Sequence, residues 1–131
     1  MGFIKGIHHI ALKCKGVEAF EETIHFYNDI LGLPVVRTWG EGPASAAMLD
    51  TGSGLMEIFA DGKDIREQGA IRHFAFDVVD ADACIEAVRS AGYEVTVEPK
   101  DICIPSEPPY PARIAFCIGP VGEEIEFFLV K

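Results

Sequence analysis

The sequence predicts an α+β fold in which one βαβββ unit occurs twice. Strand-like and helix-like patterns follow each other as strand, helix, strand, strand, strand, and this order restarts near residue 70. The two stretches also match along the chain, with HIALKC over HFAFDV and LMEIFA over EIEFFL. Such an internal duplication indicates a repeated supersecondary unit. We therefore expect a single domain, residues 1–131, made of repeats over about 5–60 and 70–131.

The first repeat begins with an alternating apolar segment at 6–14, which predicts a strand. A helix follows, and Gly32 suits the position after its last turn. Its apolar residues recur at helical spacing on one face: Phe20, Ile24, Tyr27 and Leu31. Further strands are predicted over 33–39, 44–50 and 54–60. The polar segment 61–69 is interpreted as a linker.

The second repeat starts with a predicted strand at 70–78. A helix is predicted after Asp80, which is a suitable N-cap residue, with Ile85 and Val88 facing inward and Gly92 closing it. The remaining elements are a strand at 93–97, a Pro-rich loop at 98–111, and strands at 112–118 and 123–130.

Charge and composition exclude several classes of function. The chain has 131 residues and a formal net charge of −10, which repels phosphate backbones and anionic membranes, so we expect neither nucleic-acid nor membrane binding. A small anionic substrate stays compatible with this charge if a local cation offsets it. No apolar run reaches bilayer length, and the N-terminus has no signal-peptide pattern, so we expect a cytoplasmic protein. The four cysteines form no CxxC pair and are expected to be reduced thiols.

Polar residues interrupt the apolar strands at equivalent places in the two repeats. Side chains alternate across a strand, so His9 lies on the face opposite to Ile10, and His73 occupies the matching place in the second repeat. Glu57 and Glu126 match each other in the last strands. A carboxylate in such an apolar setting is costly unless it is paired or bound to a cation.

These four residues predict a shared metal site, because imidazole and carboxylate are suitable ligands for Ni²⁺, Co²⁺, Zn²⁺ or Fe²⁺. Four protein ligands leave one or two positions for a substrate in a five- or six-coordinate site. A single strand histidine can instead be a structural hydrogen-bonding residue, and a single strand glutamate can face water. By strand parity His8 belongs to the apolar face or the strand edge and is interpreted as structural, and His25 as solvated on the first helix.

The segments HHIALKC, FYNDILGLPVV, RHFAFDVVDADACIEAVRSAGYEV and GPVGEEIEFFLV resemble the vicinal oxygen chelate superfamily over the whole chain. That superfamily includes glyoxalase I, methylmalonyl-CoA epimerase, extradiol dioxygenases, and the fosfomycin and bleomycin resistance proteins. The resemblance implies paired βαβββ modules whose mixed sheets curl around a metal cup, commonly in a homodimer.

Within the superfamily, the order His, Glu, His, Glu is similar to glyoxalase I (lactoylglutathione lyase). The resemblance implies that His9, Glu57, His73 and Glu126 are the metal ligands, with Ni²⁺ or Co²⁺ favoured and Zn²⁺ as an alternative. It implies that Glu126 is the catalytic base and Glu57 its counterpart. The implied reaction detoxifies methylglyoxal: its hemithioacetal with glutathione is isomerised to a lactoyl thioester through a metal-stabilised enediolate.

The resemblance also implies substrate-binding residues. At several of these positions the sequence differs from the usual glyoxalase I pattern, and the differences concern the binding of the thiol. Lys13 stands where glyoxalase I usually has an Arg for a glutathione carboxylate, Gly69 stands where some members have a second Arg, and GPVG replaces the usual DPDG. Other candidates for an anionic group, which can equally be surface residues, are Arg37, Arg72 and Arg113. Aromatic residues that could wall a pocket, or belong to the core, are Trp39, Phe59, Tyr110 and Phe128.

Two alternatives stay open at this point. The chain could be another enzyme of the superfamily, an epimerase or an Fe²⁺ dioxygenase, although epimerases usually have a Gln at the place of Glu57 and a dioxygenase would not need this glutamate. It could also be a small-molecule binding or resistance protein without turnover.

Overall fold

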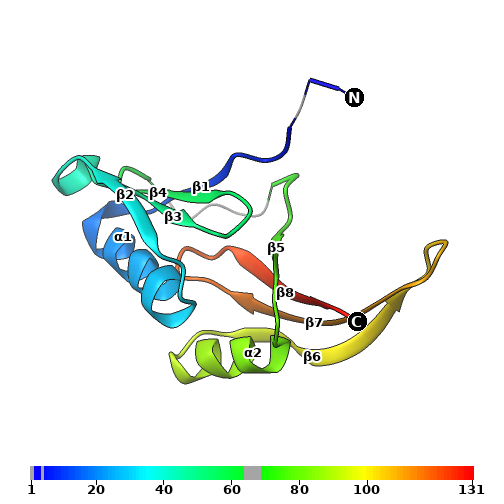
Figure 1. Cartoon of the computed structure of the whole chain (residues 1–131). Coiled ribbons are helices and arrows are strands. Elements are labelled where there is room, and N and C mark those ends of the chain that lie inside the picture. The colour runs from blue at the N-terminus through cyan, green and yellow to red at the C-terminus, as the bar shows by residue number, and fades with distance from the viewer. Residues whose placement is uncertain (1, 4, 64–68) are drawn as a thin grey trace. The chain divides into compact units, whose positions relative to one another are not determined.

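The computed structural model describes residues 2–3, 5–63 and 69–131. The chain divides into two compact units, Met1–Ile65 and Arg66–Lys131. Each unit contains a mixed four-stranded sheet with a helix, as Figure 1 shows, so the predicted α+β class is confirmed. No helix among the described residues is long and apolar enough to cross a membrane. Whether the two repeats form a single domain stays a prediction.

The first unit has the predicted strand, helix, strand, strand, strand order. Its elements are β1 (His9–Lys13), α1 (Gly16–Ile24), a π-helical turn (His25–Ile30), β2 (Val35–Trp39), β3 (Ala46–Asp50) and β4 (Leu55–Phe59). The strands lie in the order β1-β4-β3-β2, with β1 parallel to β4 and the other pairs antiparallel. Parallel neighbours need a crossover connection, which here includes α1 and the two strands that complete the sheet.

The helix of the first unit is buried only in part through the face that its period predicts. Of that face Tyr27 is fully buried, while Phe20, Ile24 and Leu31 are half-buried. Thr23 and Phe26 are fully buried as well, and Phe26 belongs to the π-helical turn that continues α1, whose wider turn shifts the face that the helix presents. Gly32 follows with a positive φ of 81°, as its predicted place after the helix requires.

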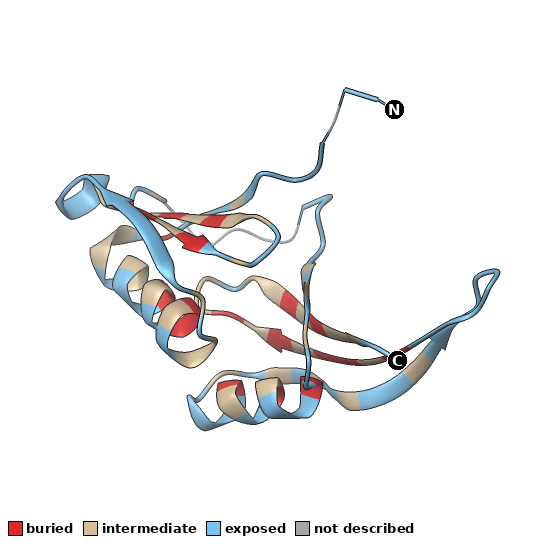
Figure 2. Ribbon diagram, viewed as in Figure 1, coloured by how far each residue is buried: buried red, intermediate tan, exposed pale blue. Residues whose placement is uncertain are grey.

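The second unit repeats this topology. Its elements are β5 (Phe74–Asp77), α2 (Ala81–Ser90), β6 (Val95–Ile104), β7 (Tyr110–Ile118) and β8 (Glu124–Val130). The strand order is β5-β8-β7-β6, with β5 parallel to β8. The helix α2 packs on the sheet, and Figure 2 shows buried positions on both. The core residues here are Ile85, Val88, Ala115, Cys117, Ile125 and Phe127.

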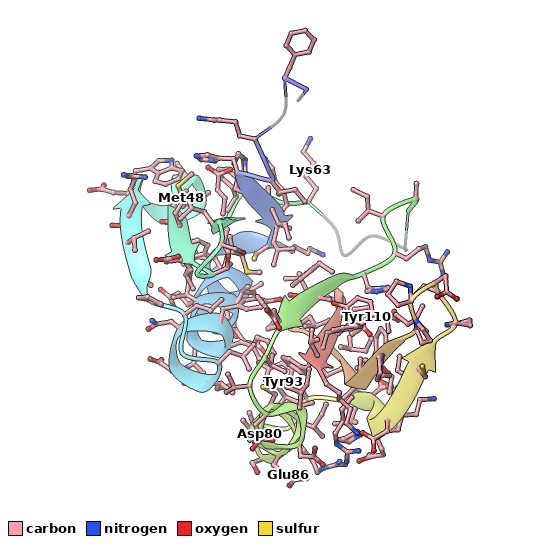
Figure 3. The ribbon with its side chains drawn as sticks, turned by 45° about the vertical axis from the view of Figure 1, so that its right-hand side comes forward. Met48, Lys63, Asp80, Glu86, Tyr93 and Tyr110 are labelled. Atoms are coloured by element: carbon pink, nitrogen blue, oxygen red, sulfur yellow. The ribbon has the colours of Figure 1, made fainter. Side chains whose placement is uncertain are left out.

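The start of α2 confirms the predicted N-cap. The backbone N–H of Ala83 donates a hydrogen bond of 3.0 Å to Asp80 Oδ1, which satisfies one of the free amides of the first turn. Figure 3 labels Asp80 at this end of α2 and Glu86 farther along the helix.

Two predictions of secondary structure were wrong in extent. The segment 98–111 is not one long loop, because β6 continues to Ile104 and β7 already begins at Tyr110. The sheet tolerates Pro99 because the pairing register shifts between Val97 and Lys100, where no regular ladder hydrogen bond is required. The predicted strand 70–78 is shorter, Phe74–Asp77. Of the predicted linker 61–69, residues 64–68 lie outside the described part of the chain.

Candidate metal centre

The two units place their glutamates in the same register against their first strands. In the parallel pair β1–β4, Glu57 lies opposite Ala11, and in the parallel pair β5–β8, Glu126 lies opposite Ala75. Each candidate histidine stands two residues before that alanine, on the same face of its strand. Alanine is small, so each histidine reaches its glutamate diagonally across the pair.

The contacts that result are nearly identical in the two units. His9 Nε2 lies 3.4 Å from Glu57 Oε1, and His73 Nε2 lies 3.2 Å from Glu126 Oε1. The glutamate side chains are only 14% and 13% exposed, whereas the histidines are 40% and 37% exposed. Each unit thus presents an imidazole nitrogen and a carboxylate oxygen that converge on one point.

The spacing of these atoms fits a bound transition-metal ion. Two ligand atoms that each lie about 2.1 Å from a metal, at octahedral or tetrahedral angles, are separated by about 3.0 to 3.4 Å. Both observed separations fall within this range. Within the described residues no three His, Cys, Asp or Glu side chains gather in a metal-binding cluster. We call each of the two His–Glu pairs a candidate half-site.

A large apolar residue flanks each glutamate on the side away from the alanine. Met48 of β3 lies opposite Glu57, and Phe116 of β7 lies opposite Glu126. The Phe116 ring also contacts His73 edge-on, with ring centroids 5.2 Å apart. Sequence reasoning missed both residues because their strands are apolar on both faces, which hides the face that carries the glutamates.

The second ring nitrogen of each histidine also has a neighbour. Nδ1 of His9 lies 2.9 Å from Nδ1 of His8, and Nδ1 of His73 lies 3.7 Å from Glu124 Oε1. Strand parity alone assigned His8 to the opposite face, but β1 begins only at His9, so His8 is not bound by the alternation of the strand. Glu124 could have been found from the sequence, because it stands two residues before Glu126 and therefore on the same face of the strand.

The substrate-binding residues predicted in the first unit share the face that carries Glu57. Arg37 lies opposite Met48, and its Nη1 lies 3.8 Å from the Met48 sulfur; Figure 3 labels Met48. In the next row, the rings of Trp39 and Phe59 meet edge-on at 6.3 Å.

Lys13 lies opposite Phe59 in the pair β1–β4, and its Nζ is 4.9 Å from the centroid of the Phe59 ring. It is also 2.9 Å from Asp61 Oδ1, so its charge is already paired. A substrate carboxylate would have to compete with Asp61 for this ammonium group.

In the second unit, Tyr110 and Phe128 lie on the face of Glu126. Their rings meet edge-on with centroids 5.7 Å apart, and Tyr110, labelled in Figure 3, is 43% exposed. Phe128 is two residues after Glu126 on β8, so the aromatic pair lies next to the glutamate on the same face of the sheet.

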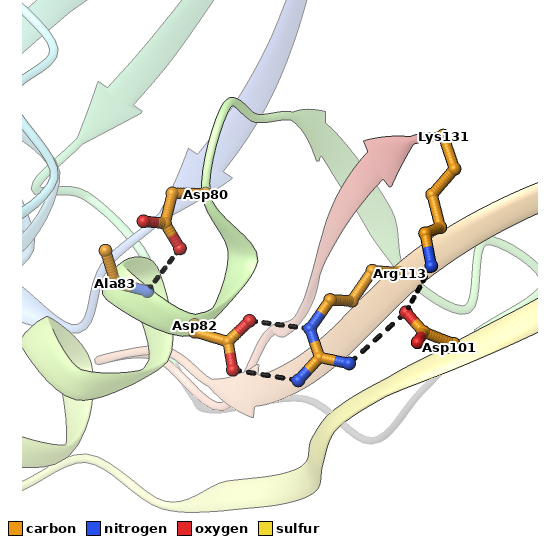
Figure 4. A network of polar contacts seen from close by, with 6 residues as sticks. All are labelled: Asp80, Asp82, Ala83, Asp101, Arg113 and Lys131. Carbon is orange, nitrogen blue, oxygen red and sulfur yellow. Dashed lines mark hydrogen bonds and ion pairs between the residues drawn. The ribbon is translucent and has the colours of Figure 1, made fainter.

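Arg113 has a different place from the one predicted. Its Nε and Nη2 donate to the two carboxylate oxygens of Asp82 on α2 at 2.6 and 2.9 Å, and its Nη1 donates to Asp101 Oδ1 at 3.2 Å (Figure 4). Lys131 Nζ lies 3.0 Å from the same Asp101 oxygen. This network lies on the helix side of the sheet, away from Glu126, so we leave Arg113 out of the candidate site. Arg72 is exposed next to His73.

The network shifts the pKa values of its members. The hydrogen bond from Arg113 lowers the pKa of Asp82, and hydrogen bonds from Lys131 and Arg113 lower that of Asp101. The hydrogen bonds that Arg113 donates to the two carboxylates raise its own pKa. These groups therefore stay charged and brace α2 against β6 and β7.

Comparison with known proteins agrees with this fold. The sequence profile of the glyoxalase/bleomycin resistance protein/dioxygenase superfamily matches residues 6–107, which include His9, Glu57 and His73 and end before Glu126. A lactoylglutathione lyase from Haemophilus influenzae is 35% identical over 116 residues, which cover 82% of each chain.

Solved structures share the fold at lower identity. A trypanothione-dependent glyoxalase I from Leishmania major has a TM-score of 0.70 at 19% identity, over 96% of this chain and 87% of that one. A fosfomycin resistance protein from Listeria monocytogenes has a TM-score of 0.71 at 16% identity, over 97% and 94% of the two chains. These likenesses concern the fold, which proteins of different activities share. Because the superfamily profile covers most of the sequence and a relative with 35% identity spans both repeats, the chain belongs to the glyoxalase/bleomycin resistance protein/dioxygenase superfamily.

Proposed function

We propose that this protein is a metal-dependent lyase of the glyoxalase I kind, which isomerises the hemithioacetal of methylglyoxal and a small thiol. The observation that carries the proposal is the pair of half-sites, His9 with Glu57 and His73 with Glu126, in one register and at one spacing. The relative named lactoylglutathione lyase supports the same reading.

The four side chains would together hold one divalent metal ion, Ni²⁺ or Co²⁺ before Zn²⁺. Members of the superfamily generally bind such ions, and imidazole nitrogen with carboxylate oxygen suits all three metals. When bound, the dication would polarise the substrate carbonyl and favour the enediolate. We further propose that the protein acts as a homodimer in the cytoplasm.

The proton transfer falls to the glutamates of the chain. Glu126 takes the proton from one carbon of the hemithioacetal and returns it to the adjacent carbon, and Glu57 is its counterpart on the other half-site. Both carboxylates are mostly shielded from water by apolar neighbours, Met48 for Glu57 and Phe116 for Glu126. A shielded carboxylate keeps the proton from exchanging with solvent during the transfer.

The identity of the thiol is a separate question. Lys13, which occupies the place of a glutathione-binding arginine, is paired with Asp61 at 2.9 Å. Aromatic residues on the two faces, Trp39 with Phe59 and Tyr110 with Phe128, offer apolar contact area for the remainder of the substrate.

The test is an assay of the metal-free protein reconstituted with Ni²⁺, Co²⁺ or Zn²⁺ in turn. Thioester formation is followed with the methylglyoxal hemithioacetals of glutathione and of a second thiol, cysteine. We expect turnover that depends on the metal, with the two thiols ranked by kcat/KM. If no metal supports thioester formation from either hemithioacetal, the lyase proposal is wrong. Stoichiometric metal binding without turnover would then point to a binding protein or another enzyme of the superfamily.

A further inference from the structure

Each candidate ligand histidine has a polar partner at its outer ring nitrogen, and the two repeats supply this partner from different positions. Nδ1 of His9 faces His8 at 2.9 Å, and Nδ1 of His73 faces Glu124 at 3.7 Å, while both Nε2 atoms face the glutamates. We propose that His8 and Glu124 are positioning residues that keep the proton on Nδ1 of each ligand histidine. This inference rests on the proposed metal centre.

The chemical reason is the single proton of a neutral imidazole. A ring nitrogen that binds a metal ion must carry no proton, so Nε2 of His9 and of His73 is available only in the tautomer protonated at Nδ1. An acceptor placed at Nδ1 stabilises that tautomer and fixes the plane of the ring. His8 accepts through its own unprotonated Nδ1, and Glu124 through its carboxylate.

Comparison of the repeats shows why two different residues are needed. The residue before the ligand histidine is His8 in the first repeat but Arg72 in the second, and an arginine side chain has donors only. The residue opposite the ligand histidine is Leu55 in the first repeat. One step before the Phe74–Ile125 pair, the same register places Glu124 opposite His73. Each repeat therefore has one acceptor, and the two repeats carry it at alternative positions.

The two partners differ in strength as well as in position. The His8–His9 separation is that of a direct hydrogen bond, whereas the 3.7 Å between His73 and Glu124 is an ion-pair distance. Glu124 presents a carboxylate oxygen and His8 a ring nitrogen, so the two repeats use acceptors of different kinds. His8 is exposed and the Glu124 side chain is 29% exposed, so substitutions at both positions leave the core intact.

The first experiment measures the affinity of the full chain for Ni²⁺ alone, by competition with a chelator. His8→Arg and Glu124→Leu each exchange a residue for its counterpart in the other repeat and remove the acceptor. We expect each to weaken Ni²⁺ binding by about 10- to 100-fold. His8→Gln replaces the ring nitrogen by an amide oxygen acceptor, Glu124→Gln keeps an oxygen acceptor, and both should retain most of the affinity. His25→Arg, at an exposed histidine paired with Asp29, is the matched control and should bind Ni²⁺ as the wild type does.

Two further measurements separate positioning from simple structural damage. The double variant His8→Arg, Leu55→Glu installs the arrangement of the second repeat in the first, and it should recover the affinity lost in His8→Arg. Nitrogen-15 spectra of the Zn²⁺-loaded protein, in which the metal ion takes Nε2, should show Nδ1 protons of His9 and His73 that exchange slowly with solvent in the wild type. The Nδ1 proton of His9 should exchange faster in His8→Arg, and that of His73 in Glu124→Leu.

The outcomes distinguish this inference from the proposed function. Unchanged Ni²⁺ affinity in His8→Arg and Glu124→Leu, or unchanged solvent exchange of both Nδ1 protons, would overturn the positioning role. A wild-type protein that binds no Ni²⁺ would overturn the metal centre and this inference with it. A wild-type protein that binds Ni²⁺ without acting on the hemithioacetal, while the variants lose affinity, would overturn only the proposed reaction.

Discussion

His73 Nε2 lies 3.2 Å from Glu126 Oε1, diagonally across the parallel pair β5–β8, and His9 stands in the same relation to Glu57 across β1–β4. The two contacts have the separation expected of neighbouring ligands on one metal ion. They make the two glutamates equivalent in geometry.

The first prediction concerns the catalytic base. Glu126→Gln removes the proton acceptor while it preserves shape, so we expect kcat to fall by about 100- to 10,000-fold with Ni²⁺ still bound. Glu57→Gln should cost less in kcat, and Glu86→Gln, on the exposed side of α2, should cost nothing. Steady-state kinetics with metal analysis of each variant checks this. A larger loss of kcat in Glu57→Gln than in Glu126→Gln would reverse the assignment of the base.

The second prediction concerns metal-dependent stability. A ligand that binds only the native state stabilises it by about 2.7 kcal/mol at 100 times its Kd, so Ni²⁺ should raise the melting temperature of the metal-free protein. Glu57→Ala and Glu126→Ala should each lose most of that rise, because each removes half of a His–Glu pair. Differential scanning calorimetry with and without Ni²⁺ measures it. Stoichiometric Ni²⁺ in both alanine variants would refute the ligand assignment.

The third prediction concerns the thiol. Because Asp61 Oδ1 holds Lys13 Nζ at 2.9 Å, Asp61→Asn leaves the ammonium group free to pair with a carboxylate of the substrate. We expect KM for the glutathione hemithioacetal to fall several-fold in Asp61→Asn, with kcat nearly unchanged. Lys13→Met should raise KM instead. If neither substitution moves KM, Lys13 does not contact the thiol.

The fourth prediction concerns stability at acidic pH. The pKa values of Asp82 and Asp101 are lowered in the folded protein by hydrogen bonds, from Arg113 to Asp82 and from Lys131 and Arg113 to Asp101. A carboxyl with a lowered folded pKa stabilises the native state above its unfolded pKa of about 4, and this contribution is lost as pH falls through the folded value. Between about pH 5 and pH 2, urea unfolding of Arg113→Met should therefore depend less on pH than that of the wild type. Because Arg113 lies on the helix side of the sheet, hemithioacetal turnover should be unchanged; equal pH profiles would contradict the bracing role.

The fifth prediction concerns the cysteines. Burial raises the pKa of the Cys117 thiol to about 12, and burial together with Asp80 raises that of Cys84, whereas Cys103 is exposed. A thiolate is the reactive form, so a disulfide reagent should modify Cys103 first in the native protein and Cys14 and Cys117 only after unfolding. Cys103→Ser should abolish the fast phase. A fast phase that persists in this variant would place an accessible thiol elsewhere.

The strand face of each candidate metal ligand could be predicted from the sequence because it depends on local periodicity. Glu57 stands out as a polar residue between apolar ones, and His9 as a polar residue at the start of an apolar strand; the second repeat marks the same places with Glu126 and His73. The order of the elements and the N-cap Asp80 are local features too, so sequence patterns predicted them. The same holds for the burial of Ile85 and Val88 on α2.

Sequence patterns failed where the answer depends on partners that are distant in the chain. Arg113 carries a charge that would suit an anionic substrate, so its residue type made it a candidate. In the structure it pairs with Asp82 of α2 and Asp101 of β6, on the face of the sheet that the helix covers. The β6 strand continues past Pro99 because β7 pairs with it around a register shift. The π-helical turn buries both Phe26 and Tyr27, and the spacing of apolar residues in the sequence does not indicate this turn.

Sequence by itself thus determined which residues could bind a metal, because residue type and strand parity are properties of the chain. Only tertiary structure decided how they meet: the parallel register sets Glu57 beside Ala11 and Glu126 beside Ala75, and brings each histidine within 3.4 Å of its glutamate. It also decided that His8 and Glu124 face the outer nitrogens. The physical reason is that hydrogen-bond register between strands far apart in the chain is a collective property of the sheet.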